Sequence, residues 1–198
     1  MLQTYGYIVL PDSLTPEKLL LANGRPKTLA HVQAVAEECV RLGRLFGLEA
    51  ESCRLGGMLH DISAVIRPAD MLAWTEAHAL PLCEAERRHP FLLHQRLSRE
   101  VAQRCFDVRE AAVLSAIECH TTLRAHATAM DMALFLADKI AWDQPGEPPY
   151  LAQLLRALEH SLPAACLCYM TWTEESGRLL YPHTWWTEAA AWLRKIER

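Results

Sequence analysis

Helical periodicity is the feature of this sequence that most constrains its fold. From Thr28 to Phe46 the apolar residues recur at three- and four-residue intervals, which places them on one face of an α-helix. Gly47 follows directly and is suited to end that helix, because glycine readily adopts left-handed backbone conformations. No stretch shows a convincing alternating pattern of a β-strand. The sequence therefore predicts an all-α fold.

Similar apolar stripes follow along the chain. They predict a helix that starts at Pro16 and others over roughly 50–60, 68–78, 91–105, 110–120, 129–142, 151–158 and 185–196. Asp107 and Glu110 have the spacing of a capping box. Gly56-Gly57 favours close helix packing over a phosphate loop, because no strand precedes it.

The segment 144–149, rich in Pro and Gly, is the clearest break in the chain. The helical stripes beyond it are too apolar to be solvated alone, so we expect them to pack on the preceding helices. This predicts an N-terminal extension over residues 1–24 and one helical core over residues 25–198.

Composition narrows the class of protein. The chain has 198 residues, of which 51% are hydrophobic, and its formal net charge is −4. This charge disfavours binding to nucleic acid or a membrane surface through a broad basic face. Seven cysteines without a C-x-x-C pair indicate a reducing compartment, and the N-terminus does not resemble a signal peptide. We therefore expect a cytoplasmic protein.

Side chains able to bind metal ions lie on or beside the apolar stripes. His60 and Asp61 are adjacent at the end of one apolar helix, where two ligands can reach one ion from different sides. The other candidates, on separate helices, are His31, His94, His120 and Asp138. A buried carboxylate is costly unless a cation neutralises it. Several helices that each direct His or Asp inward can form a two-metal site in a helical bundle.

In order and spacing these residues resemble the pattern H…HD…H…H…D of the HD-domain phosphohydrolases. The closer similarity is to the YqeK-like branch, the symmetrical bis(5′-nucleosyl)-tetraphosphatases. The stretches that carry it are His31–Ala36, Met58–Asp61, Phe91–His94, Cys119–Thr122 and Phe135–Ile140. The resemblance covers roughly residues 25–195 and implies a single HD-domain helical bundle with C-terminal helices packed on the core.

The resemblance also implies a metal-binding role for each position of the pattern. His31, His60, Asp61 and Asp138 would hold one ion, His94 and His120 would hold a second ion, and Asp61 would bridge the two. His60 and Asp61 are the expected catalytic residues. The implied cofactors are two divalent or mixed-valence ions. We expect iron, with manganese, cobalt or zinc as alternatives, because mixed imidazole and carboxylate donors suit all four.

The implied reaction is hydrolysis of diadenosine tetraphosphate to two ADP by a metal-activated water. Hydroxyl and cationic groups near the metals suit phosphate oxygens, and the candidates are Thr121, Thr122, Arg124, Lys139 and Arg67. The chain also departs from common family residues. Ala64 stands where many members have a phosphate-binding lysine. The other replacements are Thr28, Gln95 and Leu123.

Two other functions fit the same residues. One is an HD phosphatase of another nucleotide, and the other is a metal-binding nucleotide sensor with little turnover, which Ala64 motivates. A nucleotide is the expected partner, and a homodimer through the Trp-rich C-terminal face is a further option. Trp142 or Trp74 offers a stacking surface for a nucleobase. The charged run Glu84–Arg88 is typical of a solvated helix face.

Overall fold

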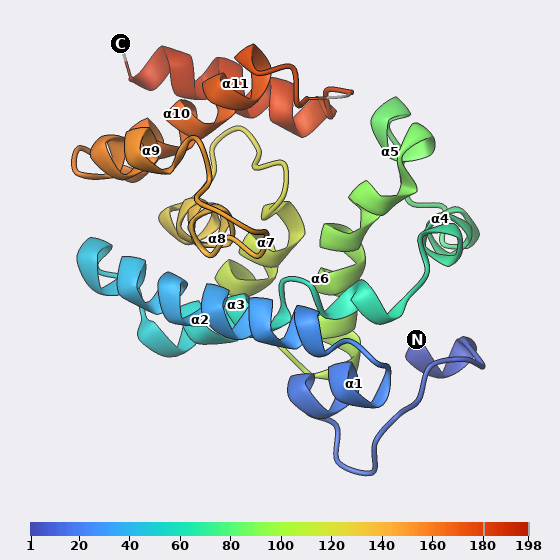
Figure 1. Ribbon diagram of the computed structural model, residues 1–198. Coiled ribbons are helices and arrows are strands. Elements are labelled where there is room, and N and C mark those ends of the chain that lie inside the picture. The colour runs from blue at the N-terminus through green and yellow to red at the C-terminus, as the bar shows by residue number, and fades with distance from the viewer. Residues whose placement is uncertain (180, 198) are drawn as a thin grey trace.

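The computed structural model describes residues 1–179 and 181–197. Over these residues the chain forms eleven α-helices and three short 3₁₀ helices and contains no strand, which confirms the all-α prediction (Figure 1). The α-helices are α1 (Pro16–Ala22), α2 (Pro26–Phe46), α3 (Ala50–Leu59), α4 (Pro68–Ala77), α5 (Glu84–Arg88), α6 (His94–Cys105), α7 (Ala111–Cys119), α8 (Ala129–Ile140), α9 (Leu151–Leu158), α10 (Leu162–Glu175) and α11 (Thr184–Ile196). The 3₁₀ helices are η1 (Leu2–Thr4), η2 (Ile62–Val65) and η3 (Pro90–Leu93).

Local signals explain where several helices begin and end. The long helix α2 starts at Pro26 rather than Thr28, with proline at its first position. It ends at Gly47, whose φ of 72° is the left-handed conformation that favours glycine. α8 starts with a capping box, in which the Thr128 hydroxyl accepts from the Asp131 N–H and the Asp131 carboxylate accepts from the Thr128 N–H.

The capping box predicted from Asp107 and Glu110 is wrong. Glu110 is itself the N-cap residue of α7 and makes no capping hydrogen bond. Its carboxylate accepts instead from the Ser52 hydroxyl at 2.7 Å. Asp107 lies before the helix with a positive φ of 55°, and its carboxylate accepts from Arg109 Nε at 2.7 Å. Tertiary and turn contacts therefore use both side chains that would have capped the helix.

Two adjacent glycines bring α3 close to its neighbours. A Cβ atom at Gly57 would lie 2.4 Å from the Cα atom of Ala36 on α2. A Cβ atom at Gly56 would lie 3.0 Å from the Met130 Cε atom on α8. This confirms close helix packing as the role of Gly56-Gly57. The contact sets the spacing of α2 and α3, which each carry one of the candidate ligands.

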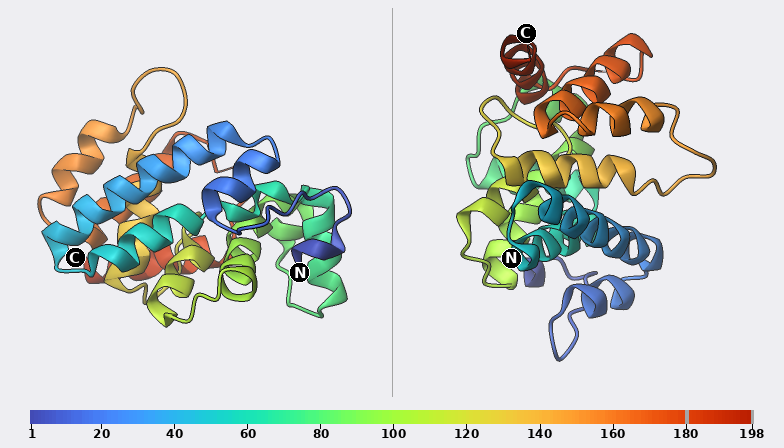
Figure 2. Two further views of the ribbon diagram at one scale, coloured as in Figure 1. Left: turned by 90° about the horizontal axis from the view of Figure 1, so that it is seen from below. Right: turned by 90° about the vertical axis from the view of Figure 1, so that its left-hand side faces the viewer.

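Helix α8 lies at the centre of the bundle. It packs against α2, α3, α7 and α10. The right-hand view of Figure 2 shows it between the C-terminal helices and the α2–α3 pair. Every residue from Met130 to Ala137 is buried. Asp138 therefore follows a fully buried helical segment and enters the interior of the molecule at a fixed position.

The helices after the break pack on this core, as expected. α10 is a helix that the periodicity did not indicate, and it packs directly against α8. All six tryptophan side chains are buried or half-buried. Two of them, Trp172 and Trp186, contact Tyr150 and Tyr169 in an internal aromatic cluster. These tryptophans stabilise the fold internally, and a homodimer through them stays a prediction.

The charged run in α5 is only partly a solvated face. Glu84, Arg87 and Arg88 are exposed, but Glu86 is 2% exposed. Arg96 of α6 donates to its carboxylate at 3.0 Å, and His183 Nε2 lies 3.5 Å from the same oxygen. The prediction fails at Glu86 because two other segments pack over this side of the short helix.

The N-terminal segment shares the core of the bundle. Leu2, Leu19 and Leu20 belong to the same buried apolar cluster as the later helices, and the boundary after residue 24 stays a prediction. None of the seven cysteines forms a disulfide. Among the described residues, no helix combines the length and apolar character needed to cross a membrane.

Candidate metal centre

Three candidate ligands stand at helix ends, and a hydrogen bond orients each ring. His60 and His120 directly follow α3 and α7, and His94 is the first residue of α6. In each ring Nδ1 donates a hydrogen bond of 2.7–2.8 Å to a backbone carbonyl three residues earlier. These carbonyls belong to Gly57, Phe91 and Ile117. Because a carbonyl only accepts, Nδ1 carries a proton, and Nε2 is the atom of each neutral ring that can bind a metal ion.

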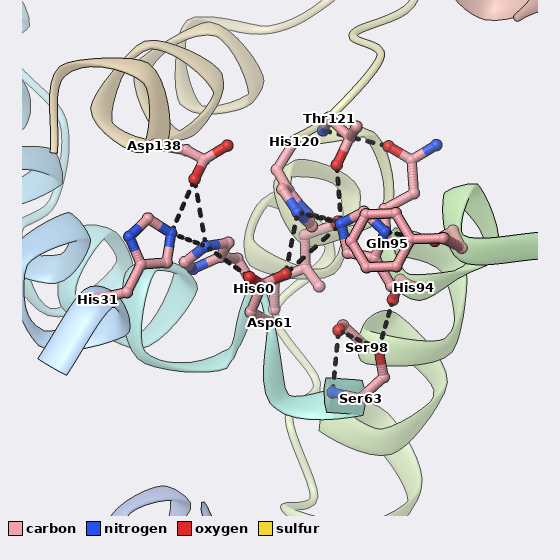
Figure 3. Close-up of polar contacts among 12 residues, drawn as sticks. His31, His60, Asp61, Ser63, His94, Gln95, Ser98, His120, Thr121 and Asp138 are labelled. Carbon is pink, nitrogen blue, oxygen red and sulfur yellow. Dashed lines mark hydrogen bonds and ion pairs between the residues drawn. The ribbon is translucent and has the colours of Figure 1, made fainter. Parts of the chain in front are cut away.

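The Nε2 atoms meet in two pairs (Figure 3). His31 Nε2 and His60 Nε2 are 3.3 Å apart, and His94 Nε2 and His120 Nε2 are 3.1 Å apart. Asp138 Oδ1 lies 3.0 Å from His31 Nε2 and 3.5 Å from His60 Nε2. His31 Nε2 donates to the Asp138 carboxylate, and a bound cation can take the place of that proton. Donor atoms about 2.1 Å from one ion lie about 3 Å from each other, so this spacing fits a bound metal.

Asp61 links the two histidine pairs. Its Oδ2 lies 3.7 Å from His60 Nε2, and its Oδ1 lies 3.5 Å from both His94 Nε2 and His120 Nε2. Burial acts to raise the pKa of this carboxyl, but the surrounding imidazoles, His60 first, lower the pKa overall. Burial also lowers the pKa of His120 to about 4. An ionised carboxylate beside a neutral imidazole suits a divalent metal ion.

The six predicted ligands therefore come together in one place. Two groups of them have donor atoms that all lie within 4.8 Å of one another. The groups are His31–His60–Asp138 and His60–Asp61–His120. His94 joins the second group through its contact with His120. The donor set fits a metal centre, and the role of each residue as a ligand stays a prediction.

Buried polar residues hold the ligands from behind. The Ser63 hydroxyl donates to the carbonyl of His94 at 2.8 Å, and the Ser98 hydroxyl donates to Ser63 Oγ at 3.0 Å. Gln95 Oε1 accepts from the backbone N–H of Thr121 at 3.2 Å. Ser63, Gln95 and Ser98 are each 0% exposed. They fix the position of His94 and of the turn after His120.

A cavity of about 250 Å³ opens beside the ligands. We call it the aromatic cavity, because Trp142, Tyr150 and Tyr169 line it together with five of the six candidate ligands and Lys139. Lys139 donates to the His120 carbonyl at 3.2 Å and to the Asp138 carboxylate. Burial acts to lower the pKa of Lys139, but the Asp138 carboxylate raises it overall, so the ammonium group stays charged. The cavity thus combines a cation with aromatic surface.

The predicted phosphate contacts divide into two sets. Thr121 and Lys139 line the aromatic cavity, and Arg67 lines a second cavity that also reaches Asp61. The structure does not bring Thr122 and Arg124 to either cavity. Thr122 is 2% exposed, and its hydroxyl oxygen accepts from Gln95 Nε2.

Arg124 points away from the metal cluster. Its guanidinium donates to Glu118 Oε2 at 3.2 Å and to Ser115 Oγ. It lies over the ring of Trp185, 5.8 Å from the centroid. Trp74, one of the two proposed stacking residues, lines neither cavity and stacks on His78 with 3.9 Å between ring centroids. Trp142 is the stacking candidate that the fold brings to the site.

Sequence reasoning missed three residues of the site. Gln95 was noted only as a departure from the family, although a polar residue on a buried helix face signals a structural hydrogen bond. Tyr150 and Tyr169 lie beyond the break at 144–149. They reach the site because α10 packs on α8, and no local pattern indicates this contact.

The fold and this donor cluster together define an all-α protein whose centre can hold metal ions between helices. The model of the HD domain family matches residues 28–143, a range that contains all six candidate ligands. The chain therefore belongs to the HD domain family.

Two other proteins are similar to this chain. An uncharacterized protein in the pepC 5′ region of Lactococcus lactis subsp. cremoris is 38% identical over 135 residues, which are 68% of this chain and 69% of that protein. A crystal structure from Clostridium acetobutylicum, described as a predicted HD superfamily hydrolase involved in NAD metabolism, has a TM-score of 0.82. It is 23% identical, and the match covers 91% of this chain and 96% of that chain, so it shows the shared fold.

Proposed function

We propose that this protein is a metal-dependent phosphohydrolase that cleaves symmetrical dinucleoside tetraphosphates. With diadenosine tetraphosphate, one water molecule is consumed and two ADP molecules are released. The observation that carries the proposal is the aromatic cavity, which is lined by candidate ligands, the Lys139 ammonium group and four aromatic side chains. Metals and a cation suit phosphates, and aromatic surface suits a nucleobase.

Bound metal ions would supply an activated water and neutralise charge that develops on phosphoryl oxygens. The chain's own residues would orient the phosphates. Lys139 is held by the Asp138 carboxylate and the His120 carbonyl, which fixes its ammonium group beside the cluster. The Thr121 hydroxyl donates to His94 Nε2 at 2.9 Å. When that nitrogen is engaged as a ligand, the hydroxyl is free to donate to a phosphate oxygen.

The aromatic residues support a nucleotide rather than a small phosphate ester as substrate. Trp142 is half-buried, and its indole Nε1 has no hydrogen-bond partner within the described residues. Tyr150 is fixed by a hydrogen bond of 2.8 Å from its hydroxyl to the Lys139 carbonyl. Tyr150 is 2% exposed and packs edge-on against Trp142, so Trp142 provides the surface on which a base can stack.

The test is product analysis with protein purified without chelator. Diadenosine tetraphosphate, ATP and AMP are each incubated with the protein, with and without added iron or manganese. We expect ADP as the sole product from diadenosine tetraphosphate. Release of phosphate from the mononucleotides alone would favour another HD phosphatase, and tight binding with no product would favour a sensor. Either result would overturn the proposal.

Variants connect the activity to the cluster. We expect His60→Ala and Asp61→Ala to lose at least about a thousandfold in kcat, because each removes a predicted ligand. His160→Ala is the matched control, since His160 is an exposed histidine between α9 and α10. Circular dichroism shows whether each variant remains folded. Full activity in folded Asp61→Ala protein would exclude the proposed centre.

A further inference from the structure

A second cavity also reaches the candidate metal centre. It has a volume of about 280 Å³ and shares Asp61, Phe91 and His94 with the aromatic cavity. We call it the arginine cavity, because Arg25 and Arg67 are among the residues that line it. Two separate cavities of similar size thus border the candidate metal centre. The proposed function assigns a role to the aromatic cavity alone.

The charge of the arginine cavity suits a polyanion. Asp61 is the one carboxylate among the described residues that line it, and this carboxylate also faces the histidine pairs. Arg25 is exposed and makes no capping hydrogen bond to α2, so its guanidinium is available to a ligand. The guanidinium groups of two arginines are well suited to bind phosphate groups through paired hydrogen bonds.

The second arginine is held in place by its neighbours. Arg67 Nε donates to Asp70 Oδ2 at 2.7 Å, and its guanidinium lies over the Tyr7 ring, 4.1 Å from the centroid. The Tyr7 hydroxyl donates to the same Asp70 oxygen at 2.6 Å. These contacts orient the guanidinium and leave its terminal N–H groups for another acceptor. The N-terminal segment thereby helps to position a residue of the cavity.

An exposed aromatic ring stands where the two cavities meet. Phe91 is 62% exposed, and its ring stacks on His94 with 4.5 Å between centroids and 23° between planes. A large apolar side chain that is both exposed and held rigid offers a surface to a planar ligand. The small side chain of Ala64 lines the same cavity and leaves room beside it.

We propose that the arginine cavity binds the second nucleoside diphosphate half of the substrate. The first half occupies the aromatic cavity, and the central phosphates lie at Asp61, which both cavities share. This inference rests on the proposed function. It explains why a symmetrical substrate with two nucleoside ends fits a centre that borders two cavities, and it assigns Arg25 and Arg67 as binding residues for the second half.

The test counts ADP molecules bound to the metal-loaded protein by equilibrium dialysis. We expect two ADP per chain for the wild type and one for the double variant Arg25→Ala/Arg67→Ala. The KM for diadenosine tetraphosphate should rise about tenfold or more in that variant, because charged hydrogen bonds to phosphate are lost. Arg44→Ala is the matched control, since Arg44 is an exposed arginine in the last turn of α2, at the opposite end of that helix from Arg25.

The outcomes separate this inference from the proposed function. One ADP per chain in the wild type, or two in the double variant, would overturn the second binding site even if diadenosine tetraphosphate is cleaved to ADP. Another outcome is that the wild type binds two ADP and the double variant one, while the wild type cleaves no dinucleoside tetraphosphate. In that case the arginine cavity is a nucleoside diphosphate site, and the proposed activity fails. Both arginines have exposed side chains, so the double variant should fold normally.

Discussion

His94 Nε2 and His120 Nε2 lie 3.1 Å apart, and the Nδ1 atom of each ring is bound to a backbone carbonyl. Neither ring can turn its lone pair away without losing that hydrogen bond. The two nitrogens are therefore directed toward one point, where a cation can replace the Thr121 hydroxyl as the partner of His94 Nε2. This preorganised pair is the clearest structural indication that the centre takes a metal.

Metal removal should lower thermal stability. An ion that binds the folded state alone stabilises it by about 2.7 kcal/mol when its concentration is a hundred times the dissociation constant. We expect dialysis against a chelator to lower the melting temperature and added iron or manganese to restore it, as measured by scanning calorimetry. The melting temperature of Asp61→Asn should respond much less to metal. Equal melting temperatures before and after chelation would contradict a bound metal.

Gly57→Ala should disturb the packing that brings α2 and α3 together. The added Cβ atom would lie 2.4 Å from backbone Cα of Ala36, so one helix must shift. Such overpacking costs about 1–3 kcal/mol in the free energy of unfolding, which urea denaturation measures. Gly6→Ala is the control, because a Cβ atom there meets nothing within 4 Å. Equal stability of the two variants would argue against the close contact.

Gln95→Ala should destabilise the turn that follows α7. Its amide accepts from the backbone N–H groups of Thr121 and Thr122 at 3.2 and 3.3 Å, and Gln95 is 0% exposed. Loss of this acceptor leaves buried donors unpaired and costs about 1–3 kcal/mol. Gln103→Ala, at a half-buried position on the same helix, is expected to cost less. A small effect on both stability and activity in Gln95→Ala would show that the turn does not depend on this amide.

Glu86 should make the fold sensitive to acid. Burial acts to raise its pKa, but His183, the Cys83 N–H and Arg96 lower the pKa to about 2. Because the folded-state pKa is depressed, this stabilisation is present above the usual pKa of 4.5 and is lost as the pH falls toward 2. The loss amounts to about 3 kcal/mol at most.

Denaturation measured at several pH values tests this account of Glu86. The wild type should lose stability between pH 4.5 and 2 more steeply than Glu86→Gln does. Glu84→Gln is the control, because Glu84 is exposed on the same short helix. Parallel pH profiles for the wild type and Glu86→Gln would show that the Glu86 carboxylate does not cause the loss of stability in acid.

The sequence was sufficient to predict most of the helices, though not α10, and the six candidate ligands that come together in the fold. The ligands could be predicted because each stands on or beside an apolar stripe, and a polar residue in that position needs a partner. Asp138 follows the unbroken apolar run Met132–Ala137, and this run by itself predicts a buried segment. The helical pattern alone does not connect these residues with one another. The family resemblance connects them, because it gives each residue a position in one ligand pattern.

Tertiary packing decides which residues other than the candidate ligands reach the cavities. Thr122 and Arg124 are close in sequence to His120, but the turn there directs one toward Gln95 and the other toward Glu118. Proximity along the chain therefore does not predict which side chains reach the cavity. Arg25 illustrates the reverse case, since it is distant in sequence from Ala64 and Arg67 and lines the same cavity with them.

Hydrolysis of diadenosine tetraphosphate in oxygen-18-labelled water tests the central claim most directly. The account predicts that ADP is the sole product and that one of every two ADP molecules carries a single labelled oxygen on its terminal phosphate. That result locates attack by water at the middle of the phosphate chain. Formation of AMP and ATP, or no reaction by metal-loaded protein, would contradict the account.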